Sequence, residues 1–397
     1  MRPLHFDVVV SGGGLVGASL AIALAPSGRR VALIEAAPLP KSAPSWDERT
    51  IALNVASRRI YQRLGVWDLI RSDTTPILAT HISERGRFGV ARFTAEEAGE
   101  EALGWNVPVR ALGAALWQRM SALPNVTILC PARVESIETN ADAVRLGLAP
   151  GGALEARLVV ACDGAQSAIR RFLGIGAHED DYQQTAIVGA VKPERPHRGV
   201  AYERFTPDGP LAVLPKPGTD CALVWTVPTA KAPTMLAGSD EEFLKQLQDA
   251  FGQRLGRFLA TGKRNGHPLT RVLSDELTAQ RVIFAGNAAQ TLHPIAAQGF
   301  NLGLRDVATV AEVAGAATDP GADEVLREYA HRRRGERETV SGFTDGLVRL
   351  FSNTIPGLSE ARHWGLLALD LVPPVKQAVM RQNLGFAGGT PVMARRP

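Results

Sequence analysis

The chain has 397 residues, of which 45% are hydrophobic and 21% charged, a composition typical of a globular protein with a large core. This composition excludes disordered, collagen-like and coiled-coil chains, and the length predicts two or three domain-sized units. The 44 Lys and Arg residues exceed the 40 Asp and Glu residues by only four, which does not indicate a nucleic-acid-binding protein. The three cysteines, Cys130, Cys162 and Cys221, are far apart in sequence, so we expect no disulfide framework and no metal site.

The N-terminal segment predicts a strand, a glycine-rich turn and a helix. Residues 7–11 are apolar enough for a buried strand, residues 15–26 predict a helix of small residues, and residues 30–35 predict a second strand. Four glycines interrupt the apolar stretch, and a signal peptide or membrane span gains nothing from such sharp turns. The segment therefore predicts the start of a parallel sheet.

The predicted secondary structure changes several times along the rest of the chain. We predict helices over 49–64 and 109–123, short strands with turns over 126–161, and a mixed or antiparallel sheet over 186–228. A further buried strand is predicted over 281–286, and helices follow over 300–317 and 324–351, with two amphipathic segments up to about residue 385.

We therefore predict an α/β fold with a discontinuous Rossmann-like dinucleotide-binding domain, an inserted mixed β-sheet substrate domain and a C-terminal helical segment. The predicted dinucleotide-binding domain comprises residues 1–75, 104–180 and 270–320. The predicted substrate domain comprises residues 76–103 and 181–269, and the C-terminal helices residues 321–397.

Gly12, Gly14 and Gly17 form a Gly-x-Gly-x-x-Gly pattern after a predicted strand and at the start of a predicted helix. The first glycine permits a tight turn, the second lets the backbone approach a pyrophosphate, and the third allows close helix–strand packing. The unpaired N–H groups and dipole of the helix N-terminus favour phosphate, so Leu15 and Val16 are candidate contacts.

Glu35 ends the second predicted strand 18 residues after Gly17, close to the spacing of about 20 residues at which an acid accepts ribose hydroxyls. A glycine-rich turn without a ligand is the alternative. Strand, helix and acid together favour a dinucleotide site.

Three further segments resemble motifs of the FAD-dependent aromatic hydroxylases, the single-component flavoprotein monooxygenases of the p-hydroxybenzoate hydroxylase type. Residues 47–53 (DERTIAL) resemble the segment in which an arginine, here Arg49, lies against the flavin. Residues 162–164 (CDG) resemble the motif found where flavin and NAD(P)H bind. Residues 286–294 (GNAAQTLHP) and 298–303 (QGFNLG) resemble the second flavin motif.

Within this family, the last motif is most similar to that of the ubiquinone-biosynthesis hydroxylases, in particular those that act on 2-polyprenyl-6-methoxyphenol. The resemblance implies FAD as cofactor and NAD(P)H and O₂ as co-substrates. It implies a monooxygenase that hydroxylates the ring of a polyprenylated (methoxy)phenol in ubiquinone biosynthesis. The cofactor contacts expected beyond the first motif are Glu35, Arg49, Arg110, Asp163, Gly164, Asn287, Pro294, Ala297, Gln298, Gly299 and Asn301.

Two positions depart from the family pattern. Asn287 stands where the family has an aspartate, and because an amide keeps an acceptor oxygen, flavin binding should survive. Ala297 stands where the family has a glycine, and if this position requires a positive φ, alanine costs on the order of 1 kcal/mol.

The N–H groups of Gln298, Gly299 and Asn301 precede the predicted helix and are expected to face a pyrimidine carbonyl of the flavin. For Arg49 and Arg110, a surface ion pair is the alternative. The run Arg332, Arg333 and Arg334 lies among acids and predicts a solvated helix face.

The sequence identifies no catalytic base. His293 and Pro294 are candidates near the flavin, but a structural histidine fits equally well. Tyr202, Phe205 and Trp225, in the inserted sheet, are candidates to line the substrate pocket, although aromatic side chains in strands often belong to the core.

Two apolar stripes near the C-terminus have helical spacing. The first comprises Leu347, Leu350, Phe351 and Ile355, and the second Trp364, Leu367 and Leu371. They fit docking to a membrane interface or packing against protein, and both remain open. We expect a cytoplasmic protein, either free or peripheral on the inner face of the membrane, with other quinone-biosynthesis enzymes as candidate partners.

Two rival functions remain. The same fold hosts flavin-dependent reductases of prenyl chains and halogenases. A flavin-free prenyl-binding escort, of the kind of the Rab GDP-dissociation inhibitors, belongs to another class. The flavin-facing segments favour an enzyme.

Overall fold

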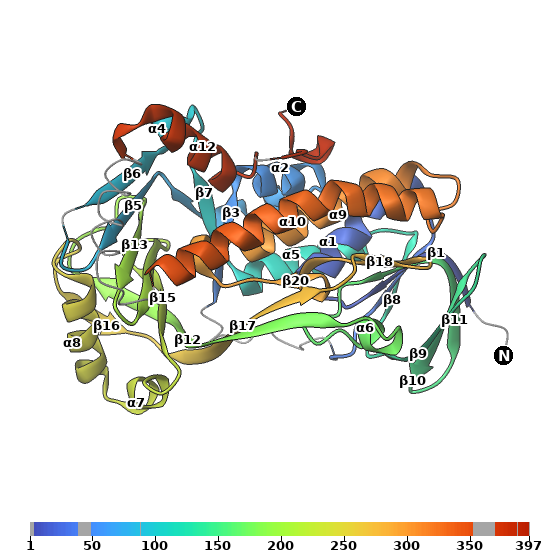
Figure 1. Cartoon of the computed structure of the whole chain (residues 1–397), viewed down its shortest axis with the longest axis horizontal. Helices are drawn as coiled ribbons and strands as arrows, with labels where there is room; N and C mark the ends of the chain where they lie inside the picture. Colours follow the sequence, from blue (N-terminus) through green and yellow to red (C-terminus); the bar gives the residue numbers. More distant parts are fainter. Residues whose placement is uncertain (1–3, 39–48, 88, 352–369, 387, 397) are drawn as a thin grey trace.

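The computed structural model describes residues 4–38, 49–87, 89–351, 370–386 and 388–396. These residues form a mixed α/β fold with a C-terminal helical segment, which confirms the predicted fold class. The described strands form three sheets, and helices pack on and between them (Figure 1).

The first sheet has a parallel core built from three separated stretches of the chain. Its order is β19 (Val282–Phe284), β11 (Ala153–Ala161), β1 (Leu4–Ser11), β2 (Val31–Ile34) and β8 (Val126–Leu129). β9 (Arg133–Thr139), β10 (Val144–Ala149) and β18 (Thr278–Ala279) extend it in antiparallel pairs. Val8, Val9 and Val10 of β1 are fully buried, as expected for a strand covered on both faces.

Helices α1 (Leu15–Leu24), α5 (Val109–Ser121) and α9 (Gln298–Ala316) lie together beside this sheet (Figure 1). Gly17 allows α1 to approach the turn after β1, because a Cβ at this position would lie 1.9 Å from the Gly12 carbonyl oxygen. The short helix α6 (Ala168–Phe172) follows β11.

The second sheet is mixed. Strands β13 and β5 are parallel, and the other described strand pairs of this sheet are antiparallel. Its order is β20 (Gln290–Thr291), β17 (Asn265–Ser274), β12 (Ala177–Pro193), β15 (Cys221–Pro228), β14 (Gly209–Pro215), β13 (Val200–Thr206), β5 (Ala79–Glu84) and β6 (Val90–Thr94), with β16 (Phe258–Thr261) beside β12. Helices α7 (Ala232–Ala237) and α8 (Asp240–Phe251) cover one face and share a core with it.

The predicted helix over 49–64 was wrong at its start. Residues Thr50–Asn54 form β3, which pairs with β7 (Gly104–Pro108) in a small sheet completed by β4 (Thr75–Ile77). Helix α2 (Val55–Arg63) begins only after Asn54, whose side chain accepts a hydrogen bond from the Ser57 N–H at 2.9 Å. Pairing with a distant strand overrides the local pattern here. The short helices α3 (Trp67–Ile70) and α4 (Ala95–Ala98) follow in the chain.

The long helix α10 (Asp323–Phe351) matches its predicted range and runs beside α9 along the molecule (Figure 1). The prediction of a solvated arginine face was wrong for Arg333, which is only 2% exposed. Arg333 Nε donates to Asp306 Oδ1 at 2.6 Å, and its guanidinium also pairs with Glu336. Arg333 therefore joins α10 to α9 through a buried charge network.

The C-terminal stripes lie largely outside the described side chains. Leu347, Leu350 and Phe351 belong to α10, and Ile355, Trp364 and Leu367 fall outside the described residues. Leu371, ahead of α12 (Pro373–Asn383), is 73% exposed. Among the described residues, no helix is long and apolar enough to cross a membrane.

Candidate active site

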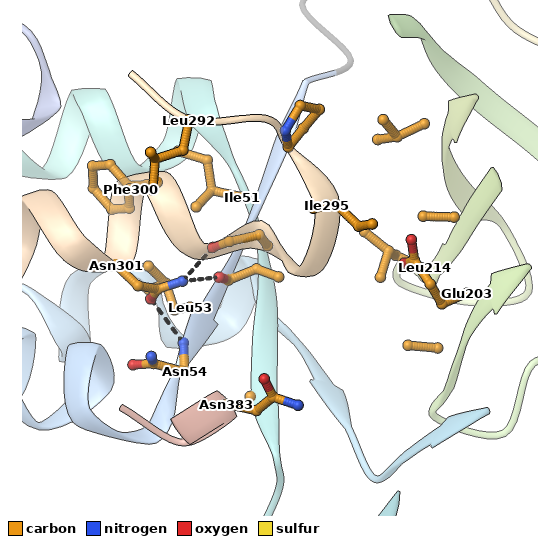
Figure 2. A pocket seen from close by; sticks show the side chains of 18 of the residues that line it. Ile51, Leu53, Asn54, Glu203, Leu214, Leu292, Ile295, Phe300, Asn301 and Asn383 are labelled. Carbon is orange, nitrogen blue, oxygen red and sulfur yellow. Dashed lines mark hydrogen bonds between the residues drawn. The ribbon is translucent and has the colours of Figure 1, made fainter. Parts of the chain in front are cut away.

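A cavity of about 770 Å³ lies between the N-terminal ends of α1 and α9, strand β3 and the second sheet. Figure 2 shows Glu203 and Leu214 on the side of the sheet, with Ile51, Leu53 and Asn301 on the opposite side. The cavity therefore joins the glycine-rich turn to the inserted sheet.

The glycine-rich turn is shaped to admit a ligand. Gly12 has a φ of +106°, and a Cβ there would lie 2.5 Å from the Cys162 carbonyl oxygen. At Gly14, which caps α1, a Cβ would meet no described atom within 4 Å. Among the described residues, no side chain caps α1, and Leu15 and Val16 line the cavity. Free N–H groups beside open space fit a phosphate.

Glu35 directly follows β2 and holds the turn in place. Its Oε2 accepts a hydrogen bond from the Gly13 N–H and its Oε1 accepts one from the Ala37 N–H, each at 2.7 Å. A carboxylate has about four acceptor sites, so two remain for ribose hydroxyls. The ribose contact stays a prediction, and the structure adds a role in ordering the loop.

Asp163 and Gly164 follow β11 at the same end of the sheet as the glycine turn. Asp163 Oδ2 accepts from the Ala168 N–H at 2.8 Å and the Ile169 N–H at 3.2 Å, which caps α6. Its Oδ1 is buried without a hydrogen-bond partner among the described residues. A buried acceptor without a donor is costly, so this atom fits a donor group of a bound cofactor. Gly164, with φ +89°, lines the cavity.

The second flavin-like motif forms the start of α9. Ala297 is the N-cap and adopts a left-handed conformation, with φ 50° and ψ 33°. Gly299 lines the cavity, and a Cβ there would meet nothing closer than Leu292 Cβ at 4.0 Å. Gln298 is buried, and its Nε2 donates to Asn383 Oδ1 at 3.4 Å. Gln298 and Gly299 thus lie in the first turn of the helix, where N–H groups lack helical partners, and Asn301 follows four residues after the N-cap.

The side chain of Asn301 joins three segments of protein (Figure 2). Its Oδ1 accepts from the Asn54 N–H at 3.0 Å and the Ser57 hydroxyl at 2.6 Å. Its Nδ2 donates to the carbonyls of Ala52 at 2.9 Å and Ala297 at 2.7 Å. These bonds occupy the side-chain amide fully, so it has no hydrogen bond left for a ligand. Sequence reasoning missed Asn54 and Ser57, although Asn before a helix is a capping signal.

Asn287 is exposed and lines the cavity. It lies in the short helix η3 (Gly286–Ala288), which begins at Gly286 with a φ of +58°. Asp306 Oδ2 accepts from the Gly286 N–H at 2.9 Å and from Gln290 Nε2 at 2.7 Å, and its other oxygen binds Arg333. The buried charge network thus supports the turn that presents Asn287.

The structure favours a structural role for His293. The side chain is 1% exposed, and its Nδ1 accepts from the Ile295 N–H at 3.1 Å. Its ring lies edge-to-face with Tyr182 at 5.1 Å, and burial lowers its pKa to about 4. The cavity lining includes Pro294 but not His293. A buried neutral imidazole that holds a turn is a poor catalytic candidate.

Arg49 and Arg110 come close together at the surface. The Val109 N–H donates to the Arg49 carbonyl oxygen at 3.0 Å, and both arginine side chains are exposed. Neither lines the cavity. Their contact with flavin stays a prediction.

Two of the three aromatic residues predicted to line the substrate pocket, Tyr202 and Phe205, border the cavity, and their contact with substrate stays a prediction. Trp225 does not line the cavity, and its ring packs 5.8 Å from Phe243 of α8. Tyr202 borders the cavity, but its ring lies 5.5 Å from Phe251 of the same helix. Successive side chains of a strand point to opposite faces, so the neighbours of these residues face the cavity instead.

This alternation places Glu203 in the cavity, between Ala201 and Phe205 on β13. None of the described residues forms a hydrogen bond or ion pair with its carboxyl group, and burial raises its pKa to about 7. Sequence reasoning missed this residue. The alternation of side chains along a strand predicts that Glu203 and Phe205 share a face. The sequence does not indicate that this face lines the cavity.

No group of His, Cys, Asp and Glu in the described part of the chain could hold a metal ion. The cysteines Cys130, Cys162 and Cys221 are unpaired.

Comparison with known proteins identifies the family. The FAD binding domain family matches residues 5–343. The chain is 39% identical to ubiquinone hydroxylase UbiL of Rhodospirillum rubrum, covering 96% of this chain and 89% of that protein. It is 31% identical to 3-demethoxyubiquinol 3-hydroxylase of Escherichia coli, covering 96% and 98%.

Solved structures share the fold. The p-nitrophenol 4-monooxygenase PnpA of Pseudomonas putida has a TM-score of 0.78 at 21% identity, covering 97% of this chain and 99% of that one. The HpxO protein of Klebsiella pneumoniae, solved with FAD, has a TM-score of 0.76 at 18% identity, covering 96% and 98%. The predicted resemblance is confirmed: the chain belongs to the FAD binding domain family, and its cofactor is FAD.

Proposed function

We propose that this protein is an FAD- and NAD(P)H-dependent monooxygenase that uses O₂ to hydroxylate the ring of a polyprenylated (methoxy)phenol in ubiquinone biosynthesis. The observation that carries the proposal is the apolar cavity that connects the two helix N-termini to the second sheet. The names of the two relatives, a ubiquinone hydroxylase and a 3-demethoxyubiquinol 3-hydroxylase, support it.

The charge of the cavity favours a neutral substrate. Its described lining contains no Lys, Arg or His, and Glu203 is its one carboxyl group. A substrate carboxylate would be buried there without a cation and near another acid, which is unfavourable. Side chains such as Leu214, Phe205 and Ile295 would instead bury a phenol ring and the start of an isoprenoid tail.

The residues present fit FAD. The N-terminus of α1, at Gly14, Leu15 and Val16, would hold the pyrophosphate. The first turn of α9, from Gln298, would place N–H groups and a positive dipole end beside the electron-rich part of the flavin ring. When bound, FAD supplies the redox chemistry that links NAD(P)H oxidation to O₂. The other proposed contacts are Gly12, Gly17, Glu35, Arg49, Arg110, Asp163, Gly164, Asn287, Pro294, Ala297, Gly299 and Asn301.

The protein's own task is to orient the phenol and exclude water, which would divert reducing equivalents to peroxide. We assign the first sheet and its helices to FAD, with the domain boundaries of the sequence analysis, and the second sheet to the substrate. Both form walls of one cavity, so ring and cofactor would meet without intervening solvent.

A polyprenylated phenol partitions into lipid, so we propose that the C-terminal segment docks on the inner face of the membrane. Leu371 is 73% exposed and Val375 49% exposed at the start of this described segment. Apolar side chains of this kind can enter an interface. Flotation with anionic liposomes tests this: loss of binding in Leu371→Ser/Val375→Ser is expected, and unchanged binding would contradict it.

The function is tested with the purified FAD-loaded protein, NADH or NADPH, O₂ and a geranylated methoxyphenol. We expect phenol-stimulated oxidation of the nicotinamide and, by mass spectrometry, a product that carries one oxygen atom from isotopically labelled O₂. If the rate of nicotinamide oxidation is the same with and without the phenol, and no oxygenated product forms, the proposal is contradicted. Protein that folds but never retains flavin would favour the escort alternative.

A further inference from the structure

We propose that Glu203 is the catalytic base of this enzyme, and that its carboxylate accepts the proton of the substrate's phenol hydroxyl inside the cavity. The inference rests on the proposed function, since it requires a phenol as substrate. It supplies the base that the sequence motifs leave unidentified.

The fold places Glu203 at the centre of a sheet. It pairs with Ala212 of β14 on one side and with Ile82 of β5 on the other. Strand pairing on both sides fixes its backbone, and alternation directs its side chain to the cavity face, where Figure 2 shows it near Leu214. A base held on a central strand is well positioned to meet a bound ring.

The surroundings of Glu203 leave its carboxyl group free for a ligand. The cavity-lining side chains that share its face on the adjoining strands are apolar or neutral, among them Thr80 and Ile82 of β5 and Ala212 of β14. Pro294 and Ile295, ahead of α9, also line the cavity. Among the described residues, nothing competes with a phenol for this acceptor.

The basic side chains nearest in the sheet lie on the opposite face. Arg204 lies on the opposite face of β13, where its Nε donates to the Ala250 carbonyl at 3.0 Å. His81 and Arg92 form a separate pocket on that face. Glu84 shares the face of Glu203 but lies opposite Phe205 and outside the cavity lining.

Removal from water, rather than a neighbouring charge, therefore sets the acidity of Glu203. Burial raises its pKa from 4.5 to about 7. A base is most effective when its pKa lies near the working pH, because it is then both ionised and a good proton acceptor. At neutral pH Glu203 would be about half ionised.

The proposed step is a proton transfer from the phenol hydroxyl to Glu203. The phenol O–H bond breaks, its electron pair stays on oxygen, and the proton forms an O–H bond with a carboxylate oxygen of Glu203. The resulting phenolate delocalises negative charge onto ring carbons, which makes the ring a better nucleophile toward the oxidant that FAD, NAD(P)H and O₂ supply. After hydroxylation, the proton on Glu203 returns to the phenolate oxygen of the product or passes to solvent.

The test compares wild type with Glu203→Gln, which keeps the side-chain shape but cannot accept the proton. FAD content and thermal unfolding should match wild type. With the geranylated methoxyphenol, we expect kcat/KM of the wild type to rise with pH through about 7. In the variant, kcat should fall about 10²- to 10⁴-fold and that pH step should disappear. KM should change little, since the amide still hydrogen-bonds the hydroxyl.

A second readout does not need turnover. Without NAD(P)H, the readout uses a more acidic phenol such as 4-nitrophenol, whose pKa is close to that of Glu203. Bound to FAD-loaded wild type, it should show more of the phenolate absorption band than when bound to Glu203→Gln, which cannot accept its proton. Glu203→Asp, which keeps a shorter carboxylate, should retain part of the band and the pH step. Glu179→Gln, an exposed strand carboxylate on β12, is the matched control and should behave as wild type.

A folded, FAD-loaded Glu203→Gln with wild-type kcat, pH profile and phenolate band would overturn the assignment of the base and leave the proposed function intact. A wild type that binds the phenol as phenolate through Glu203, yet forms no oxygenated product, would support the base and contradict the proposed reaction.

Discussion

Replacing Ala297 by glycine should stabilise the protein, because Ala297 occupies a backbone conformation that favours glycine. Its φ of 50° and ψ of 33° lie in the left-handed region, which costs an L-residue with a Cβ roughly 1–2 kcal/mol. Glycine avoids that cost but loses about 0.5–1 kcal/mol more in conformational entropy on folding. The expected net gain in the free energy of unfolding is therefore about 0–1.5 kcal/mol, with a midpoint of about 0.75 kcal/mol.

The assay is reversible denaturation of the FAD-loaded protein with urea, followed by flavin fluorescence and circular dichroism. The matched control is Ala311→Gly inside the same helix α9, where glycine should cost about 1 kcal/mol. The two substitutions are chemically identical and should move the urea midpoint in opposite directions. If Ala297→Gly lowers stability as the control does, residue 297 does not hold a strained left-handed conformation.

Three further predictions concern the site. Glu35→Ala should weaken FAD binding by about 1.5–3 kcal/mol, the range for hydrogen bonds to a charged group; equilibrium dialysis measures this, and full flavin occupancy on dilution would refute the ribose contact. Gly299→Val should lose FAD without loss of fold, because its Cβ would meet no described atom closer than 4.0 Å; unchanged flavin per folded molecule would mean that the cofactor does not approach Gly299. Phe205→Ala should raise peroxide release per NAD(P)H oxidised through water entry, whereas Trp225→Phe, on the α8 face, should not; equal coupling in both would remove Phe205 from the pocket.

The local sequence pattern was sufficient to predict those elements and motifs of this protein that residues adjacent in the chain determine. The strand–glycine turn–helix unit at Gly12, Gly14 and Gly17 needs only apolar runs and residues that tolerate a sharp turn, and all are adjacent in sequence. The length of α10 followed in the same way from its helical periodicity. The family resemblance had the same basis, because its motifs are short continuous segments.

Tertiary structure alone decided which face of each element carries function. The period of two in β13 and β15 separates Glu203 from Tyr202 and Thr226 from Trp225, but does not say which set meets the cavity and which meets α8. That choice depends on where a helix distant in sequence packs.

The sequence did not predict the buried polar contacts, for the same reason. Arg333 belongs to an arginine run typical of a solvated surface, and only the arrival of Asp306 from α9 makes its burial tolerable. The side-chain oxygen of Asn301 likewise accepts hydrogen bonds from Asn54 and Ser57, which are far away in the chain, and the sequence pattern did not indicate these partners. A polar side chain satisfies its hydrogen bonds with whatever the fold brings beside it, and its neighbours in sequence do not specify those partners.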